Sequence, residues 1–320
     1  MSVFSKFLVS VICIAVLASC ASKPKANPDD YLKQLLVTPF SPEDYALDRM
    51  TKAGLPKDFM AAFTQSLRVA PPKRKKNVPT DPLEKIVSLN VLGFLSHGDY
   101  SKHYSDGAVK KIKDFIKHNR KSLALAEKTD QVPKEVLASL LWVETQFGKH
   151  TGTFTLPQVY FRLLQANHPQ IAKRTILELN QRSAEVNALK PQLTEAALYS
   201  KVIDRSNKKS DWALQQLVSI SNLYQKGFHG ILRMKSSFAG AFGKCQFIPS
   251  TYEKYAKSPI HQDADLFDIR DAIFSVANFL HENGWNNDIP TSKNNALFEY
   301  NRIHDYGDVI LKLAEASRSK

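Results

Sequence analysis

The sequence lacks the motifs of several common enzyme classes. His281 is followed by Glu282, but the second histidine of an H-E-x-x-H zinc motif is missing, and neither a glycine-rich phosphate loop nor a G-x-S-x-G elbow is present. Cys245 has no neighbouring cysteine with which to form a zinc site. Alternating apolar and polar residues are scarce, which disfavours a β-rich fold. These absences argue against metal, nucleotide and serine-hydrolase chemistry, and we expect no cofactor and no metal.

Long apolar runs are also absent, apart from one at the N-terminus. It extends from Phe7 to Ala18 and ends in the tetrapeptide Leu-Ala-Ser-Cys20. The run is shorter than the roughly 20 apolar residues of a membrane-spanning helix. We therefore expect residues 1–19 to be a lipoprotein signal peptide, with Cys20 lipidated and residues 20–30 acting as a polar tether.

Cysteine is rare, with three in 320 residues. Cys13 would leave with the signal peptide and Cys20 would carry the lipid, so Cys245 would stand alone in the mature chain. No internal disulfide is then possible, and an exported protein of this kind relies on burial of a large core. We expect a monomer.

Acidic residues are fewer than basic ones: the sequence has 31 Asp and Glu against 44 Lys and Arg, which gives a formal net charge of +13. A basic surface suits nucleic acid, anionic lipid head groups or an acidic polymer. Export argues against nucleic acid, and we expect no such partner. Peptidoglycan, which carries peptide carboxylates, remains compatible with this charge.

Helical periodicity dominates the rest of the chain, and the fold is expected to be mainly α from residue 31 to residue 320. The helical pattern within residues 154–226 is expected to break into polar loops near residues 167–169 and 207–210, and Pro133 can open a helix that is apolar on most sides. The helical segments are 31–67, 108–129, the stretch after Pro133, 154–226, 271–281 and 309–314.

One carboxyl stands in an unusual place. Glu144 follows Leu140-Leu-Trp-Val143, the most apolar stretch of the mature chain. Beside Trp142 and Val143 a partly dry site would disfavour the charged form and raise the pKa of Glu144. A raised pKa suits a general acid that protonates a glycosidic oxygen near neutral pH. On its own, an isolated Glu near a helix end is more often a solvated residue.

Three motifs together resemble the membrane-bound lytic murein transglycosylase B family. They are Val143-Glu-Thr-Gln-Phe-Gly148, Gly240-Ala-Phe-Gly-Lys-Cys-Gln-Phe-Ile-Pro249, and the pair Tyr300-Asn301 with Tyr306. The resemblance extends from about residue 31 to the C-terminus and is weakest over residues 155–226, which would be a helical insertion. It implies a lysozyme-like α-rich fold with a glycan groove.

The resemblance also assigns candidate site residues. Glu144 matches the catalytic acid/base of the family. The candidate substrate-binding residues are Tyr100, Ser237, Gln246, Phe247, Tyr300, Asn301 and Tyr306. Without the motifs, Gln246 and Asn301 would be interpreted as turn caps, and Tyr300 and Tyr306 as core aromatics.

The implied reaction breaks the β-1,4 bond between N-acetylmuramic acid and N-acetylglucosamine. The three motifs themselves contain no second acidic residue, which fits a mechanism where the acetamido group of the sugar assists. Glu144 would act as acid and then as base, and the product would carry a 1,6-anhydromuramyl end. Two alternatives remain open: a muramidase that uses water, with an altered preference for glycan acetylation, and a cell-wall-binding lipoprotein without activity.

Some segments depart from the family pattern. Residues 257–265 stand where members often carry a calcium loop, but Pro259 interrupts them and no glycine is present, so we expect no calcium site there. Asp263, Asp265 and Asp268 form a weak metal alternative. Residues 168–211 lack an arginine pair that members use near the peptide stem, and Phe279 occupies a position where the family has Tyr.

The compartment follows from the signal peptide and its flank. Ala21 after Cys20, with no Asp at that position, is typical of sorting to the outer membrane in a cell with two membranes. We expect an exported lipoprotein at the periplasmic face of the outer membrane, attached to it through the lipid anchor.

Overall fold

The computed structural model describes residues 26–35, 38–68, 83–95 and 99–318. The signal peptide, Cys20 and the first part of the tether lie outside the described residues. The last part of the predicted tether is helical instead: α1 (Pro28–Leu32) begins inside it, and the Asn27 side chain caps the helix by accepting from the Asp29 N–H at 3.1 Å. No helix among the described residues is long and apolar enough to cross a membrane.

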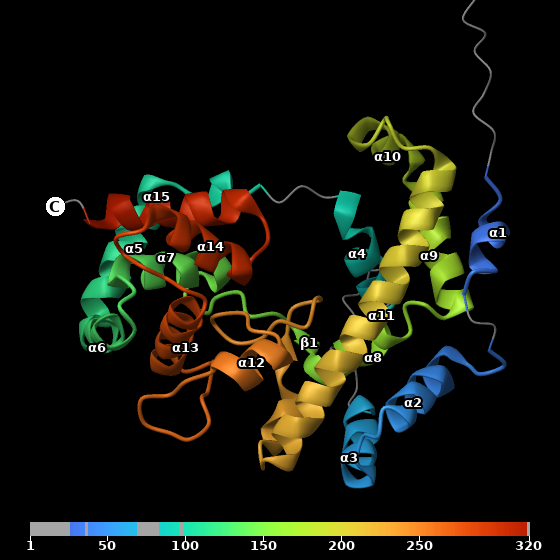
Figure 1. Ribbon diagram of the computed structural model, residues 1–320, viewed down its shortest axis with the longest axis horizontal. Coiled ribbons are helices and arrows are strands. Elements are labelled where there is room, and N and C mark those ends of the chain that lie inside the picture. The colour runs from blue at the N-terminus through green and yellow to red at the C-terminus, as the bar shows by residue number, and fades with distance from the viewer. Residues whose placement is uncertain (1–25, 36–37, 69–82, 96–98, 319–320) are drawn as a thin grey trace, which may run out of the picture.

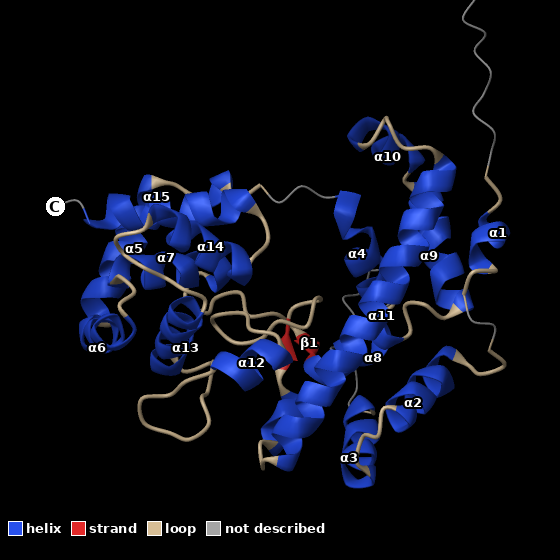
Figure 2. Cartoon of the chain, viewed as in Figure 1, coloured by secondary structure: helices blue, strands red, loops and turns tan. Residues whose placement is uncertain are grey.

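Helices make up most of the described chain, as predicted (Figure 2). After α1 they are α2 (Pro42–Lys52), α3 (Lys57–Leu67), α4 (Lys85–Val91), α5 (Asp106–His118), α6 (Arg120–Asp130), α7 (Lys134–Thr145), α8 (Leu156–Leu164), α9 (Pro169–Gln181), α10 (Ser183–Leu189), α11 (Glu195–Gln225), α12 (Pro249–Tyr255), α13 (Ile269–Glu282), α14 (Pro290–Tyr300) and α15 (His304–Arg318). Short 3-10 helices are η1 (Leu92–Leu95), η2 (Ser101–His103) and η3 (His229–Arg233), and strands β1 (Phe154–Thr155) and β2 (Lys235–Ser236) pair antiparallel.

The helices form two groups, with α12 and β1 between them (Figure 1). One group contains α5, α6, α7, α13, α14 and α15, and the other contains α1 to α4 and α8 to α11. A large apolar core extends through both groups, and a smaller one joins α4, α9, α10 and the first half of α11. The motif residues therefore come from segments that meet where the two groups adjoin.

Helix α7 is the central element of the first group and packs against α5, α6, α13 and α15. Residues 135–143 are all buried, and Pro133 directly precedes the first helical residue. This arrangement confirms the buried helix predicted after Pro133, since a helix that is apolar on most sides must be covered on most sides. Glu144 lies in its last turn and is partly exposed.

The prediction of one helix over residues 108–129 is wrong, because α5 and α6 are separated at Asn119. The Asn119 side-chain amide donates to the Phe115 carbonyl at 3.0 Å, and its main-chain N–H donates to the same carbonyl at 2.9 Å. Both donors end α5. The apolar spacing continues across the break to Leu123, so periodicity alone did not reveal it.

The polar loop predicted near residues 207–210 is also wrong, because α11 continues without a break. The Asn207 side chain accepts from the Asn167 amide at 3.2 Å. Ser210 is buried, and its hydroxyl donates to the Leu164 carbonyl at 2.5 Å. These polar residues make contacts between helices, and a polar run in the sequence does not by itself distinguish such a contact from a loop.

Gly152, just before β1, lies against the backbone of Ser236 in β2, and substitution there tests this close approach. Its φ is +94°, and a Cβ there would lie 2.1 Å from the carbonyl oxygen of Ser236. Gly54 has a similar φ of +76°, but nothing lies within 4 Å of its Cβ position. We expect Gly152→Ala to lower the free energy of unfolding by about 3 kcal/mol or more, and Gly54→Ala by about 1 kcal/mol from backbone strain alone. Urea unfolding measures both, and equal losses would contradict the clash.

Candidate active site

Glu144 combines partial burial with a single strong hydrogen bond. Its Oε1 accepts from the Tyr306 hydroxyl at 2.5 Å. Burial raises the pKa of Glu144 to about 7, and the hydrogen bond from Tyr306 offsets part of this rise because it favours the charged form. The carboxyl is therefore able to hold or release a proton near neutral pH, as the sequence predicted.

Two segments far from Glu144 in the sequence, one with Tyr100 and one with residues 300–306, lie beside this carboxyl. Tyr306 on α15 is fully buried and lies edge-to-face with Tyr100, with ring centroids 5.4 Å apart. Tyr300, at the end of α14, stacks with Tyr306 at 6.1 Å. The Asn301 amide donates to the Tyr100 hydroxyl at 3.0 Å. The negative charge of Glu144 adds to the rise in pKa of Tyr100, Tyr300 and Tyr306, all of which burial raises first.

The end of α7 is anchored to the second motif. The Thr145 hydroxyl donates to the Lys244 carbonyl at 2.7 Å and accepts from the Gly148 N–H at 2.9 Å. The next two residues, Gln146 and Phe147, have φ of 50° and 63°, a conformation that is uncommon for residues other than glycine. Sequence reasoning assigned Thr145 no role, although it directly follows Glu144 in the motif.

Gln246 lies on the loop that Thr145 anchors. Its φ is 52°, it is partly buried, and its side-chain amide donates to the Gly243 carbonyl at 2.9 Å. The neighbouring Cys245 is fully buried, and its carbonyl accepts from the Tyr300 hydroxyl at 2.5 Å. The loop is thus joined to the tyrosine cluster through the backbone of Cys245, a residue for which the sequence suggested no role.

Ser237 lies directly after β2 and is partly buried. Its Oγ accepts from the Ala241 N–H at 3.2 Å, while its own N–H donates to the Ala241 carbonyl at 2.8 Å. The loop from Ser237 to Ala241 closes through Gly240, where a Cβ would lie 2.4 Å from Tyr160 Cζ. The structure places Ser237 on this loop and shows no hydrogen bond from it to the Glu144 cluster.

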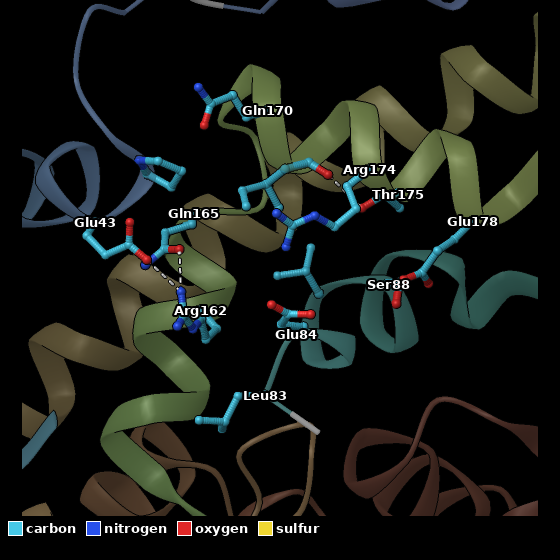
Figure 3. Close-up of a pocket in the computed structure, with 13 residues that line it drawn as sticks. Glu43, Leu83, Glu84, Ser88, Arg162, Gln165, Gln170, Arg174, Thr175 and Glu178 are labelled. Carbon is cyan, nitrogen blue, oxygen red and sulfur yellow. Dashed lines mark hydrogen bonds and ion pairs between the residues drawn. The ribbon is translucent and has the colours of Figure 1, made fainter. Parts of the chain in front are cut away.

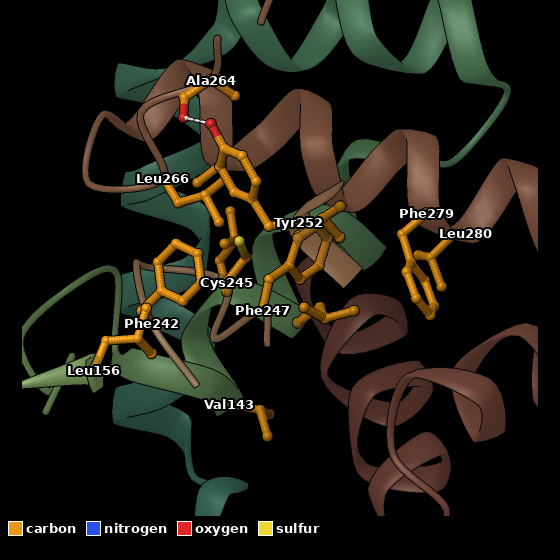
Figure 4. Close-up of a cluster of buried hydrophobic side chains, with 14 of the residues drawn as sticks. Val143, Leu156, Phe242, Cys245, Phe247, Tyr252, Ala264, Leu266, Phe279 and Leu280 are labelled. Atoms are coloured by element: carbon orange, nitrogen blue, oxygen red, sulfur yellow. Dashed lines mark hydrogen bonds between the residues drawn. The ribbon is translucent and has the colours of Figure 1, made fainter. Parts of the chain in front are cut away.

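The ring of Phe247, which was expected among the substrate-binding residues, does not face solvent. It is 2 % exposed and lies in the core beside Cys245 and Phe279 (Figure 4). Its centroid is 5.9 Å from those of Phe279 and Tyr300. Phe279 is buried as well and lies 4.8 Å from Tyr300, so both rings support that tyrosine from behind.

The carboxylates of the predicted metal alternative do not converge. Asp265 accepts from the Phe267 N–H at 2.9 Å, and Asp268 caps α13 by accepting from the Arg270 N–H at 2.7 Å. Asp263 is exposed. Among the described residues no group of three or more His, Cys, Asp or Glu side chains is placed to hold a metal ion. A calcium ion does not fit the side chains of this segment, which cap turns.

A separate polar pocket of about 300 Å³ lies between α2, α4, α8 and α9 (Figure 3). Arg162 there donates to Glu43 at 2.7 Å and to the side chain of Gln165 at 3.3 Å. Gln170 and Ile171, which belong to the stretch 168–211 that lacks the arginine pair, also line it. None of the predicted site residues does, so this pocket is distinct from the Glu144 cluster.

A family model described as the transglycosylase SLT domain matches residues 94–305, which include all the predicted site residues except Cys20 and Tyr306. The chain belongs to this family. Membership confirms the resemblance predicted from the three motifs. A curated relative, membrane-bound lytic murein transglycosylase B of Escherichia coli strain K12, is 48% identical over 56 residues, and this match covers 17% of the chain and 15% of the relative.

Solved structures of transglycosylases share the fold of this family member. Lytic transglycosylase SLT35 of Escherichia coli in complex with calcium has a TM-score of 0.59 and 16% identity, covering 92% of this chain and 98% of that chain. Soluble lytic transglycosylase SltB1 of Pseudomonas aeruginosa has a TM-score of 0.58 and 18% identity, covering 86% and 97%. SltB3 of Pseudomonas aeruginosa in complex with NAG-anhNAM-pentapeptide has a TM-score of 0.54 and 15% identity, covering 87% and 78%. The predicted mainly α, lysozyme-like fold is confirmed.

Proposed function

We propose that the chain is a lytic transglycosylase that cuts the β-1,4 bond between N-acetylmuramic acid and N-acetylglucosamine in peptidoglycan. The observation that carries the proposal is a single carboxyl, Glu144, whose pKa is raised to about 7 by burial and whose one side-chain hydrogen-bond partner among the described residues is Tyr306. No second carboxylate contributes to that pKa within the described chain. Family membership and the fold of the solved relatives support the same reaction class.

In the proposed first step, the protonated Glu144 donates its proton to the glycosidic oxygen as the bond from that oxygen to the muramyl C1 breaks. The N-acetylglucosamine portion leaves with a free 4-hydroxyl. The muramyl acetamido oxygen bonds to C1 and takes the place of a second protein carboxylate. Glu144 is now charged, and the Tyr306 hydroxyl stabilises that charge.

In the second step, the Glu144 carboxylate takes the proton of the muramyl C6 hydroxyl. The C6 oxygen bonds to C1, and the acetamido oxygen leaves. The product is a 1,6-anhydromuramyl end, the carboxyl is protonated again and no water is consumed. A group whose pKa lies near 7 serves both steps because it exchanges a proton easily in either direction.

The other site residues are assigned positioning and binding roles in this proposal. Tyr100 and Asn301 are both partly exposed and are joined by a hydrogen bond, so together they offer a polar edge to a sugar. We propose Asn301 and Ser237 as partners of the acetamido group, with Gln246 as a further binding residue. The solved relative SltB3 binds NAG-anhNAM-pentapeptide, which carries such an anhydro end.

The mass of the product ends tests the reaction. Purified protein beginning at Ala21 should release fragments from sacculi that end in anhydromuramic acid, one water lighter than reducing ends. Reducing ends would instead indicate a muramidase that uses water, and digestion of deacetylated sacculi would test its acetylation preference. If neither substrate yields fragments but the protein still binds sacculi, the protein is a binding lipoprotein and the proposal is wrong.

The same proposal places the enzyme in the cell envelope. Residues 1–19 would be removed, lipid on Cys20 would hold the chain at the periplasmic face of the outer membrane, and the residues up to Pro28 would separate the anchor from α1. We expect Cys20→Ala to move the protein from the membrane fraction to the soluble periplasmic fraction and to abolish labelling with radioactive palmitate. A Cys13→Ala variant is the matched control, and unchanged membrane attachment of Cys20→Ala would contradict the anchor.

A further inference from the structure

Three cations lie on one face of α11. Lys201, Arg205 and Lys209 are spaced four residues apart, which places them in a row about 12 Å long. Aromatic rings lie beneath them: Lys201 Nζ is 4.9 Å and Arg205 Cζ 5.4 Å from the centroid of Phe94, and Lys209 Nζ is 4.5 Å from that of Trp212. We call Lys201, Arg205 and Lys209 the α11 cation track.

A carboxylate balances the track only in part: burial lowers the pKa of Arg205, and the charge of the neighbouring Asp204 offsets some of that fall. Within the described residues, none of its three cations forms an ion pair, whereas the acidic residues of this part of α11 are engaged elsewhere: Asp204 with Lys208 at 2.9 Å and Asp211 with Arg49 at 2.7 Å. Lys209 is partly buried, and burial together with the charge of Arg205 lowers its pKa. Unpaired cations held close together and partly dehydrated cost free energy that a bound anion would offset.

Hydrogen bonds connect the track to the loop that carries Ser237. Arg205 donates to the Asn90 carbonyl at 2.9 Å, and the Asn90 amide donates to the Phe238 carbonyl at 3.0 Å. Phe238 is itself 43 % exposed. The track therefore borders the same loop as a predicted substrate-binding residue.

A second connection begins at the other end of the track. Trp212, which lies under Lys209, packs against Tyr160 with centroids 5.5 Å apart. The Tyr160 hydroxyl donates to the Gly240 carbonyl at 3.0 Å. Two carbonyls of the loop are thus held by side chains linked to the track: that of Phe238 by Asn90, which Arg205 contacts, and that of Gly240 by Tyr160, which reaches Lys209 through Trp212.

We propose that the α11 cation track binds the carboxylates of the peptide stems on the glycan strand and makes the enzyme prefer strands that bear stems. This inference rests on the proposed function, since it names the substrate class that the same site receives. Stems project from the muramyl residues, so a strand that reaches the Ser237 loop would bring their carboxylates beside α11. A flat anionic lipid surface fits less well because Arg205 and Lys209 are partly buried.

The test compares two preparations of the same soluble glycan strands, one with peptide stems and one stripped of them by an amidase. The variant is Lys201→Gln/Lys209→Gln, and Arg205 is retained because it also holds the backbone of α4. Lys208→Gln is the matched control, since this lysine lies on the same helix and is paired with Asp204. The quantity measured is the ratio of kcat/KM on stem-bearing strands to kcat/KM on stripped strands.

We expect the double variant to lower this ratio about tenfold, as two partly exposed charge contacts would, and Lys208→Gln to retain the wild-type ratio. Added salt should lower the wild-type ratio toward that of the double variant. A ratio that the double variant leaves unchanged overturns the inference. An equal fall in kcat/KM on both preparations also overturns it, because the lysines would then contact the glycan itself or stabilise the fold.

Failure of the proposed function gives a different result. If the wild type cuts neither preparation, binding of each preparation to the wild type and to the double variant is measured by calorimetry. If the wild type binds stem-bearing strands more tightly than stripped strands and the double variant does not, the track binds stems even though the protein cuts no strand. Equal binding of both preparations by both proteins overturns it.

Discussion

Glu144→Gln should lower kcat on sacculi by about a thousandfold or more, with little change in affinity for the glycan. General acid–base catalysis is worth roughly 10²- to 10⁴-fold, and here one carboxyl serves as the acid of the first step and the base of the second. Gln retains the size and the ability to accept from Tyr306, but it has no proton to donate. Release of soluble fragments over time, with binding to sacculi measured separately, checks both parts of this expectation.

Glu299→Gln is the matched control for this variant. Glu299 directly precedes Tyr300, is exposed and pairs with the exposed Arg302, so its loss should change activity by less than about twofold. Comparable residual activity of Glu144→Gln and Glu299→Gln would remove Glu144 from the mechanism.

The stability of Glu144→Gln reports whether the carboxyl is as dehydrated as its pKa indicates. A carboxyl with a folded pKa of about 7, against 4.5 ordinarily, binds its proton more tightly in the folded state. Wild-type stability should therefore fall as pH rises from 4.5 through 7, by about 3 kcal/mol in total. Gln does not titrate, so the variant should gain stability relative to wild type at pH 8 compared with pH 4. If the difference in unfolding free energy between Glu144→Gln and the wild type does not change with pH, the pKa of Glu144 is not raised.

Part of the site could be predicted because the surroundings of Glu144 are set largely by its neighbours in the sequence. The apolar run before Glu144 predicted both a buried helix and a raised pKa, and the structure bears out both. The resemblance to the family implied that Tyr300 and Tyr306 lie near the cleaved bond, and in the structure both lie beside Glu144. Which of them touches the carboxyl could not be predicted, since it depends on how α15 packs against α7 across 162 residues of sequence.

One physical cause of failure is that the periodicity of a sequence does not reveal the contacts between helices. Asn207 and Ser210 are polar because they bond to α8 and its following turn, and the sequence pattern alone suggested a loop. Phe247 belongs to the second motif, but its ring faces the core, since neighbouring residues of the motif point in different directions. Thr145 and the carbonyl of Cys245 hold the motifs together, and their roles depend on partners more than fifty residues away.

Tyr306→Phe should lower kcat/KM about thirtyfold and shift the pH profile upward. A hydrogen bond to a charged group is worth about 2 kcal/mol, and this one is made to the carboxylate that forms when Glu144 has given up its proton. The same bond lowers the pKa of Glu144, so its loss raises that pKa further. Because the acid must be protonated, wild-type kcat/KM should decline above pH 7, and the decline in Tyr306→Phe should begin at higher pH.

The pH profile separates this role from a simple loss of packing, since a structural defect lowers the rate without moving the alkaline limb. Tyr104→Phe is the matched control: Lys312, also on α15, lies over the Tyr104 ring, and no hydrogen bond from the Tyr104 hydroxyl is seen among the described residues. It should retain both the rate and the pH profile of the wild type. Two results would mean that Tyr306 does not set the proton affinity of Glu144. Either Tyr306→Phe leaves the alkaline decline of kcat/KM at the wild-type pH, or Tyr104→Phe shifts that decline by the same amount.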